Sequence, residues 1–253
     1  MAKQNEQKVA VVSGALGYVG SAISATLASA GFRIAALYHD SSEEDVRTFL
    51  AQLPGSGHQA YQCDLEDSVA VGRVLDSVEK ECGTPYACIH AAGTLPKRKQ
   101  LHLSTVEDLR EQFEVNVFGS FNFLSACAAR LKSAGRGVLI GITTASVVSQ
   151  TNTKARGAYS PMKFAVQGML VALREELAPF SVRVYSVAPG VLPGGLNKDT
   201  PAAFLDMFKS KSPTKTLASA SDVAEVVSSL CSGTSAHTSD LTVLVAPEAE
   251  TSH

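Results

Sequence analysis

The sequence predicts an α/β protein with a doubly wound, Rossmann-type parallel sheet of about seven strands and helices on both faces. Short β-branched runs alternate with longer segments of helical period along the whole chain. The runs are almost wholly apolar, as in parallel strands that are buried on both faces. Right-handed crossovers between such strands then produce a doubly wound sheet. The 253 residues, 45% hydrophobic and 18% charged, are enough for one large domain, and no linker or repeat divides them. We therefore expect 1–253 to form a single domain.

The expected strands share short length and β-branched or aromatic residues, and each is followed by a turn signal or a helical period. The first is KVAVVS, which runs directly into a glycine-rich turn. In chain order the strands are expected at 8–13, 32–38, 58–63, 86–91, 137–143, 181–187 and 241–246.

The expected helices are recognised by their periodicity and by their end signals. Gly31 closes the first, and a Ser-Ser-Glu-Glu capping pattern opens the second, which ends before Pro54-Gly55. The helices are expected at 18–30, 41–53, 66–82, 105–132 with an interruption around 116–119, 159–178 and 222–232. The irregular stretch 190–221, with three prolines and a Gly-Gly pair, is expected to be a substrate lid.

Composition excludes several classes of protein. The formal charge of −2 argues against a protein that coats nucleic acid or an anionic membrane. Five scattered cysteines without a C-x-x-C pair indicate reduced thiols, and the histidines show no metal-ligand spacing. No apolar run approaches the length of a membrane span, and the polar start MAKQNEQK is not a signal peptide. We expect a soluble, cytoplasmic protein without a bound metal.

Three glycines, Gly14, Gly17 and Gly20, lie between the first strand and the first helix. Glycine permits positive φ and lets the backbone approach a pyrophosphate, while the helix N-terminus offers N–H donors. Tyr18 and Val19 lie within this turn. The turn predicts a dinucleotide site, although a glycine-rich turn that merely packs helix against strand would have the same spacing.

The end of the second strand bears on the choice of cofactor. Tyr38 stands where an acidic ribose ligand is usual, and Asp40 comes two residues later. Without a carboxylate there a 2′-phosphate is tolerable, and Ser41 and Ser42 offer hydroxyls and helix amides to it. We therefore favour NADP(H) over NAD(H). Asp64, after the third strand, suits either an adenine amino group or a cap for the helix expected at 66.

Tyr159 is the one tyrosine of six with a lysine four residues later, Lys163. Residues four apart share a helix face, and an ammonium there lowers a tyrosine pKa from about 10. Such a tyrosine exchanges a proton near neutral pH. The pair opens the helix after the fifth strand, at the sheet edge where open α/β sheets form their sites.

Together these residues resemble the short-chain dehydrogenase/reductase family in its compact form of about 250 residues. The resemblance covers nearly the whole chain and is closest to 3-oxoacyl-carrier-protein reductase-like members. Six matches occur in the family's order: the glycine turn, Asp64, His90-Ala91-Ala92-Gly93 for the family's Asn-Asn-Ala-Gly, Asn116, Tyr159 with Lys163, and Pro189-Gly190.

Four features depart from the family pattern. The turn is G-x-x-G-x-x-G, as in longer epimerase-like members, and His90-Ala91 replaces Asn-Asn. Val191-Leu192-Pro193 stands where a threonine often contacts the carboxamide. The last strand ends Val-Ala-Pro-Glu in place of Val-Asp-Gly-Gly, a change that bears on subunit packing.

The resemblance implies an NAD(P)(H)-dependent oxidoreductase that moves hydride between nicotinamide and a ketone or secondary alcohol. It assigns the proton transfer to Tyr159, the tuning of Tyr159 and the ribose contact to Lys163, and a bound water to Asn116. The hydroxyl that holds the substrate oxygen is Ser146 by its spacing of 13 from Tyr159, or Thr144 by strand alignment. The implied cofactor site comprises Gly14, Gly17, Tyr18, Val19, Tyr38, His39, Ser41, Asp64, Leu65, Ala91, Ala92, Gly93, Tyr159, Lys163, Pro189 and Gly190.

The sequence also leaves two alternative functions open and bears on the substrate and the oligomeric state. The altered loops and C-terminus fit a cofactor-binding regulatory or structural subunit without turnover, and the glycine spacing alone fits a nucleotide-sugar epimerase. The basic run 96–99 suits either a solvated loop or a contact with an acidic carrier or a phosphorylated group. The expected substrate is a small carbonyl or alcohol, or a carrier-bound acyl group. The family resemblance also implies a homotetramer or homodimer.

Overall fold

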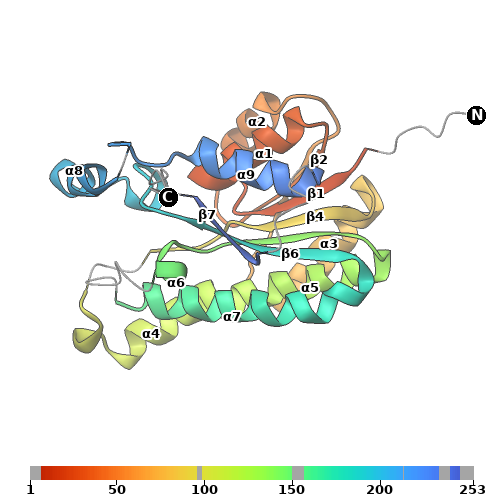
Figure 1. Cartoon of the computed structure of the whole chain (residues 1–253). Coiled ribbons are helices and arrows are strands. Elements are labelled where there is room, and N and C mark those ends of the chain that lie inside the picture. Colours follow the sequence, from red (N-terminus) through yellow and green to blue (C-terminus); the bar gives the residue numbers. More distant parts are fainter. Residues whose placement is uncertain (1–6, 96–98, 150–156, 213, 234–239, 246–253) are drawn as a thin grey trace, which may run out of the picture.

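A computed structural model describes residues 7–95, 99–149, 157–212, 214–233 and 240–245. Within them seven strands, all parallel, form one sheet in the order β3-β2-β1-β4-β5-β6-β7 (Figure 1). The strands are β1 Val9–Ser13, β2 Arg33–Tyr38, β3 Gln59–Gln62, β4 Pro85–His90, β5 Gly137–Ile142, β6 Val182–Pro189 and β7 Thr242–Val245. The predicted doubly wound parallel sheet is confirmed.

Helices cover both faces of this sheet. Figure 1 shows α1 (Tyr18–Ser29), α2 (Glu43–Gln52) and α9 (Ala220–Ser232) on one face. The opposite face carries α3 (Ser68–Cys82), α5 (Gly119–Ala134) and α7 (Tyr159–Leu177). Shorter elements fill the connections: η1 Leu101–Leu103, α4 Val106–Phe113, η2 Glu114–Phe118, α6 Ser146–Ser149, η3 Ala178–Phe180, η4 Gly195–Asn197 and α8 Ala202–Lys211.

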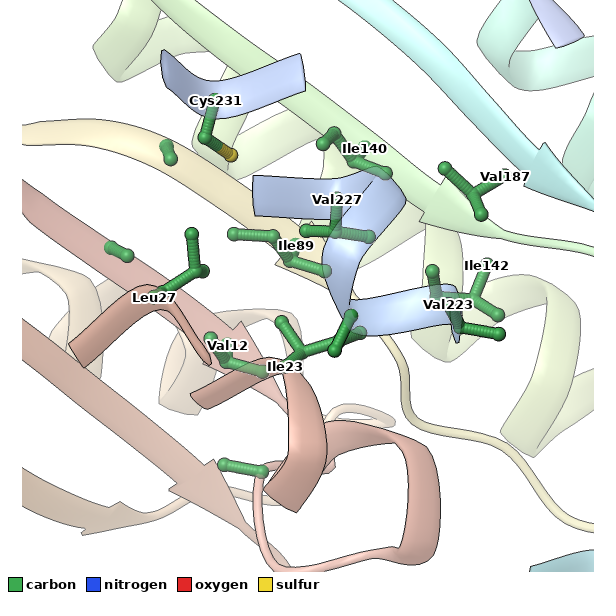
Figure 2. Packing of buried hydrophobic residues seen from close by; sticks show 14 of the residues in the cluster. Val12, Ile23, Leu27, Ile89, Ile140, Ile142, Val187, Val223, Val227 and Cys231 are labelled. Atoms are coloured by element: carbon green, nitrogen blue, oxygen red, sulfur yellow. The ribbon is translucent and has the colours of Figure 1, made fainter. Parts of the chain in front are cut away.

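Each face has its own apolar core, as the mostly apolar strands require. Figure 2 shows the cluster between the sheet and helices α1 and α9, where Ile23 and Leu27 meet Val223 and Val227 over Ile89. A second cluster on the other face includes Phe123 and Leu139. Because both faces are sealed, the polar residues of a site must gather at the strand ends.

Two helices begin later than expected because their true caps lie further along the chain. The helix expected at 66 begins at Ser68, since the Asp67 carboxylate accepts hydrogen bonds from Val69 N and Ala70 N. The helix expected at 41 begins at Glu43, since Ser42 and Asp45 form a capping box. The sixth strand runs on to Pro189, two residues beyond the expected end, and thereby reaches the site.

The predicted interruption near Asn116 takes the form of a π-helical turn, Glu114–Phe118, between α4 and α5. The segment 190–221 contains η4 and α8, which were not predicted. No helix in the described part of the chain is long and apolar enough to cross a membrane.

The strand order reverses at β1, which pairs with β2 on one side and with β4 on the other. The chain therefore leaves β1 and β4 toward opposite faces, and a crevice forms beyond their carboxyl ends. Register pairs Ser13 with His90 at this point.

Candidate active site

The glycine turn after β1 forms a close-packed cradle. Gly14 has φ +64°, and a Cβ there would lie 2.7 Å from Ala92 Cα. A Cβ on Gly20 would lie 2.1 Å from the Gly14 carbonyl oxygen. Gly17 is the N-cap of α1 and makes no side-chain capping bond, so the helix N-terminus faces the crevice with its amides. The turn fits the pyrophosphate of a dinucleotide for these reasons.

Beside the turn lies a cavity of about 860 Å³, within the usual range for small-molecule sites. Its walls come from the turn, the ends of β4, β5 and β6, the start of α7 and the segment 190–217. The predicted site residues along it are Gly17, Tyr18, Val19, Ala91, Ala92, Gly93, Ser146, Tyr159, Lys163, Pro189 and Gly190. Sequence positions more than 170 residues apart thus meet in one space.

Tyr159 and Lys163 lie one turn apart at the start of α7, and both are buried. The Lys163 ammonium donates to the Ile142 carbonyl at the end of β5, at 3.0 Å. Burial lowers the pKa of Lys163 to about 8, because the charged form loses its hydration. Lys163 therefore still carries its charge near neutral pH, at a cost in desolvation.

Both candidate hydroxyls, Ser146 and Thr144, line the cavity beyond the end of β5. Ser146 opens the short helix α6, which faces α7. Thr143 differs from both, because its hydroxyl forms a 2.7 Å hydrogen bond with the Ser186 hydroxyl of β6 and so links the end of β5 to β6. The geometry keeps Ser146 and Thr144 as alternatives.

Asn116 lies in the π-helical turn behind the cavity wall and is buried. Its side-chain oxygen accepts from Thr94 N at 2.8 Å, and its amide nitrogen donates to the Thr94 hydroxyl and to Gln112. A Cβ on Gly93 would lie 3.0 Å from Asn116 Oδ1 and 3.9 Å from Lys163 Nζ. Asn116 therefore holds the loop that passes beside Lys163.

The remaining predicted cofactor residues gather at the ends of β2 and β3. His39 Nδ1 lies 3.9 Å from an Asp64 carboxylate oxygen, and Gln62 donates to the His39 carbonyl. Asp64 also accepts from Glu66 N, so it caps a turn and does not cap α3. Leu65 packs nearby against Gly119.

The capping box changes the environment expected for a 2′-phosphate. The Ser42 hydroxyl donates to the Asp45 carboxylate at 2.6 Å and accepts from its amide, so it is already engaged. Three acidic residues, Glu43, Glu44 and Asp45, occupy the first turn of α2. Ser41 still lies beside the end of β2. The acidic residues make the N-terminus of α2 a weaker anion site than the two serines alone would suggest.

Sequence reasoning missed two sets of contacts. The Tyr18 side chain packs against Gly194 and Gly195. An added Cβ would lie 2.8 Å from the Tyr18 ring at Gly194 and 2.8 Å from Tyr18 Cβ at Gly195. The double glycine was visible in the sequence, but its partner was not. The second set surrounds His90, which the sequence marked only as a departure from asparagine.

The sheet order and the close-packed glycine turn define a Rossmann-type α/β fold. A family model described as "Enoyl-(Acyl carrier protein) reductase" matches residues 14–245. The chain belongs to the short-chain dehydrogenase/reductase family, and its relatives there are named as dehydrogenases and reductases that act on alcohol or ketone substrates.

Individual relatives agree with this membership. The chain is 29% identical over 248 residues to a 2,3-dihydro-2,3-dihydroxybenzoate dehydrogenase of Bacillus subtilis (strain 168), covering 93% of each. It is 30% identical over 247 residues to a (3R)-3-hydroxyacyl-CoA dehydrogenase of Rattus norvegicus, covering 94% of each. Among solved structures, an NAD⁺-bound xylitol dehydrogenase superposes with a TM-score of 0.84 at 22% identity, covering 97% of this chain and 100% of that one. At such identity the structural likeness concerns the fold.

Proposed function

We propose that this protein is an NAD(P)(H)-dependent oxidoreductase that interconverts a ketone and a secondary alcohol in the cavity at the strand ends. The observation that carries the proposal is the meeting of the glycine turn, the Tyr159–Lys163 pair and the Ser146 hydroxyl around one cavity. The same convergence favours turnover over a purely structural role, and it is the reason for setting aside the subunit alternative.

The roles of the side chains follow from their chemistry. The bound nicotinamide would supply or accept the hydride. Ser146 donates a hydrogen bond to the substrate oxygen, and Tyr159 gives a proton to that oxygen in reduction or takes it in oxidation. Lys163 keeps a positive charge beside Tyr159 and binds the ribose hydroxyls. Asn116 would bind a water that leads to Lys163.

We propose NADP(H) as the preferred cofactor, because Tyr38 stands where a carboxylate would repel a 2′-phosphate. The acidic first turn of α2 works against this preference. We therefore expect a preference of about tenfold or less, which corresponds to roughly 1.4 kcal/mol.

The proposal covers the whole chain as one domain in which 190–221 acts as a lid. This segment supplies apolar side chains to the cavity, among them Leu192, Leu196 and Phe208. A substrate with an apolar body beside its carbonyl suits this wall. A carrier-bound acyl group would place the same kind of carbonyl in this cavity. Residues 96–98 of the basic run expected to meet an acidic carrier lie outside the described residues, but Lys198 and Lys211 line the cavity and suit such a carrier.

We also infer a homo-oligomer, either a dimer or a tetramer. Helices α5 and α7 pack side by side (Figure 1). Large apolar side chains are exposed at Phe118, the last residue of η2, at Phe121 in α5, and at Phe164 and Val171 in α7. Burying this face against a second copy would remove these rings from water. Light scattering of wild type and Phe121→Arg tests it: the inference requires the variant to show a smaller mass.

The test of the proposed function combines binding with turnover. Thermal unfolding with NADPH or NADH measures binding, since a ligand at 100 times its Kd stabilises by about 2.7 kcal/mol. Turnover is assayed with vicinal diols, hydroxyketones and 3-oxoacyl thioesters. We expect a larger shift with NADPH, and reduction that Tyr159→Phe abolishes.

Ser146→Ala and Thr144→Val, made separately, decide which hydroxyl holds the substrate oxygen. We expect Ser146→Ala to lower kcat at least tenfold and Thr144→Val to leave most of it. A cofactor shift without turnover on the panel would favour the subunit alternative, and turnover that survives Tyr159→Phe would refute the mechanism.

A further inference from the structure

His90, the last residue of β4, lies at the switch point and is 2% exposed. Its Nδ1 lies 2.8 Å from the Ser13 hydroxyl at the end of β1, and its Nε2 lies 2.7 Å from the Ser120 hydroxyl in α5. The Ser120 hydroxyl in turn donates to the Asn116 carbonyl at 2.6 Å. A continuous chain of hydrogen bonds therefore joins the strand before the glycine turn to the π-helical turn.

The direction of each bond in this chain is determined by the number of protons. The Ser120 hydroxyl has one proton, which goes to the Asn116 carbonyl, so it must accept from His90 Nε2–H. Nδ1 then carries no proton and accepts from the Ser13 hydroxyl. The imidazole is thus fully satisfied in one neutral tautomer. Burial, together with the Lys163 charge, holds the His90 pKa low, at about 3.

This chain of hydrogen bonds ends at Asn116, which holds the loop that forms part of the cavity wall. The Asn116 carbonyl is held by Ser120, while the Asn116 side chain holds Thr94 and lies against Gly93, beside Lys163 Nζ. A buried hydrogen-bond network whose members are all satisfied is rigid. Displacement at His90 is therefore passed to the loop next to Lys163.

We propose that His90 is a positioning residue: through Ser120 it fixes the π-helical turn at Asn116 and, with it, the loop that keeps Lys163 desolvated beside Tyr159. His90 does not line the cavity, so it acts through these residues and not on the substrate. The proposal rests on the proposed function for its kinetic consequence, but its structural part is independent of turnover.

Amide side chains of two lengths test the hydrogen bonds from His90 to Ser120 and to Ser13 separately. The amide of His90→Gln reaches as far as Nε2 and can still donate to Ser120, whereas the shorter amide of His90→Asn reaches toward Ser13 only. His90→Ala loses both bonds. Ser120→Ala removes the hydrogen bond to the Asn116 carbonyl directly. Ser13→Ala is the matched control, because it removes the hydrogen bond at the other side of the His90 ring.

The first measurement is the titration of Lys163 by NMR of ¹³C-labelled lysine in the cofactor-free protein. We expect a midpoint near pH 8 in wild type, His90→Gln and Ser13→Ala. In His90→Ala, His90→Asn and Ser120→Ala the loosened loop admits water, and the midpoint should rise by half a pH unit or more. Thermal unfolding of each variant confirms that the proteins compared are folded.

The second measurement is kcat with NADPH and a carbonyl substrate turned over by the wild type. Small displacements in an active site cost up to about a hundredfold, so we expect kcat to fall tenfold or more in the three disrupting variants, with KM little changed. His90→Gln should keep kcat within about threefold. Lys163 titrations that coincide in all folded variants, or a His90→Gln as impaired as His90→Ala, would overturn the proposal. A wild type without turnover refutes the proposed function alone, since the Lys163 titration still decides the role of His90.

Discussion

Replacing Lys163 by methionine is expected to make the protein more stable while abolishing its activity. Lys163 is 8% exposed, and its ammonium has the Ile142 carbonyl as a partner at 3.0 Å. A pKa lowered from 10.5 to about 8 corresponds to roughly 3 kcal/mol of desolvation carried at pH 7. Methionine has similar length and no charge. Leaving the Ile142 carbonyl without this donor costs about 1–2 kcal/mol, so the net gain is about 1–2 kcal/mol.

The sign of the pH dependence makes this prediction specific. Between pH 8 and 10.5 the folded wild type has released the Lys163 proton while the unfolded chain still holds it. Wild-type stability therefore rises with pH in this window, by up to about 1.4 kcal/mol per pH unit relative to Lys163→Met. The advantage of Lys163→Met is thus full below pH 8 and shrinks above it. Thiols with raised pKa, such as Cys63, titrate alike in both proteins and cancel in the difference.

Urea unfolding of both proteins at pH 7, 8 and 9, at one protein concentration, measures the difference directly. At pH 7 a gain of 1–2 kcal/mol corresponds to a rise in Tm of about 2–8 °C for a chain of this length. Lys80→Met, at an exposed lysine in the last turn of α3, is the control and should show no pH-dependent gap. A Lys163→Met protein that is less stable than wild type at pH 7, or a gap that stays constant from pH 7 to 9, would refute the reasoning.

Three further predictions follow from the geometry around the turn. The folded pKa of His90, about 3, lies below its ordinary value of 6.5, so the unfolded chain takes up the proton first. Stability should therefore fall by up to about 1.4 kcal/mol per pH unit below pH 6.5, and urea unfolding of His90→Gln should lack this part of the slope. Gly20→Ala places a Cβ 2.1 Å from a turn carbonyl and should weaken NADPH binding at least tenfold by fluorescence titration; Gly72→Ala, with open space around it, should bind normally. Gly194→Ala places a Cβ 2.8 Å from the Tyr18 ring, so steady-state kinetics should show a raised KM for NADPH without loss of folding.

Most of the sheet was predictable because a parallel strand buried on both faces has a local signature. The run that became β5 is apolar at every position and the run that became β1 is apolar up to Ser13, and the structure buries all residues of both strands. The helix boundaries were less certain, since a cap depends on which side chain bonds to which amide. Asp64 and Asp67 both suit a cap, and only the structure distinguishes the turn bond of the first from the helix cap of the second.

The candidate site was predictable where it follows from motifs at strand ends. Gly17, Ser146, Tyr159 and Lys163 line one cavity because parallel strands end at the same edge. Contacts between side chains distant in sequence were not predictable. The Ser13–His90–Ser120 chain joins residues 77 and 30 positions apart, and no spacing rule relates them.

The charge on Lys163 and the neutral state of His90 depend on each other. Lys163 and His90 are both buried, and the Lys163 charge lowers the pKa of His90, so the site favours a single positive charge. The lysine keeps it because its ammonium meets the Ile142 carbonyl, whereas both imidazole nitrogens are satisfied by hydroxyls in the neutral form. The charge is thereby kept on α7, on the same helix as Tyr159 and one turn from it. A histidine can therefore stand at the switch point without taking the proton that the proposed chemistry requires on Lys163.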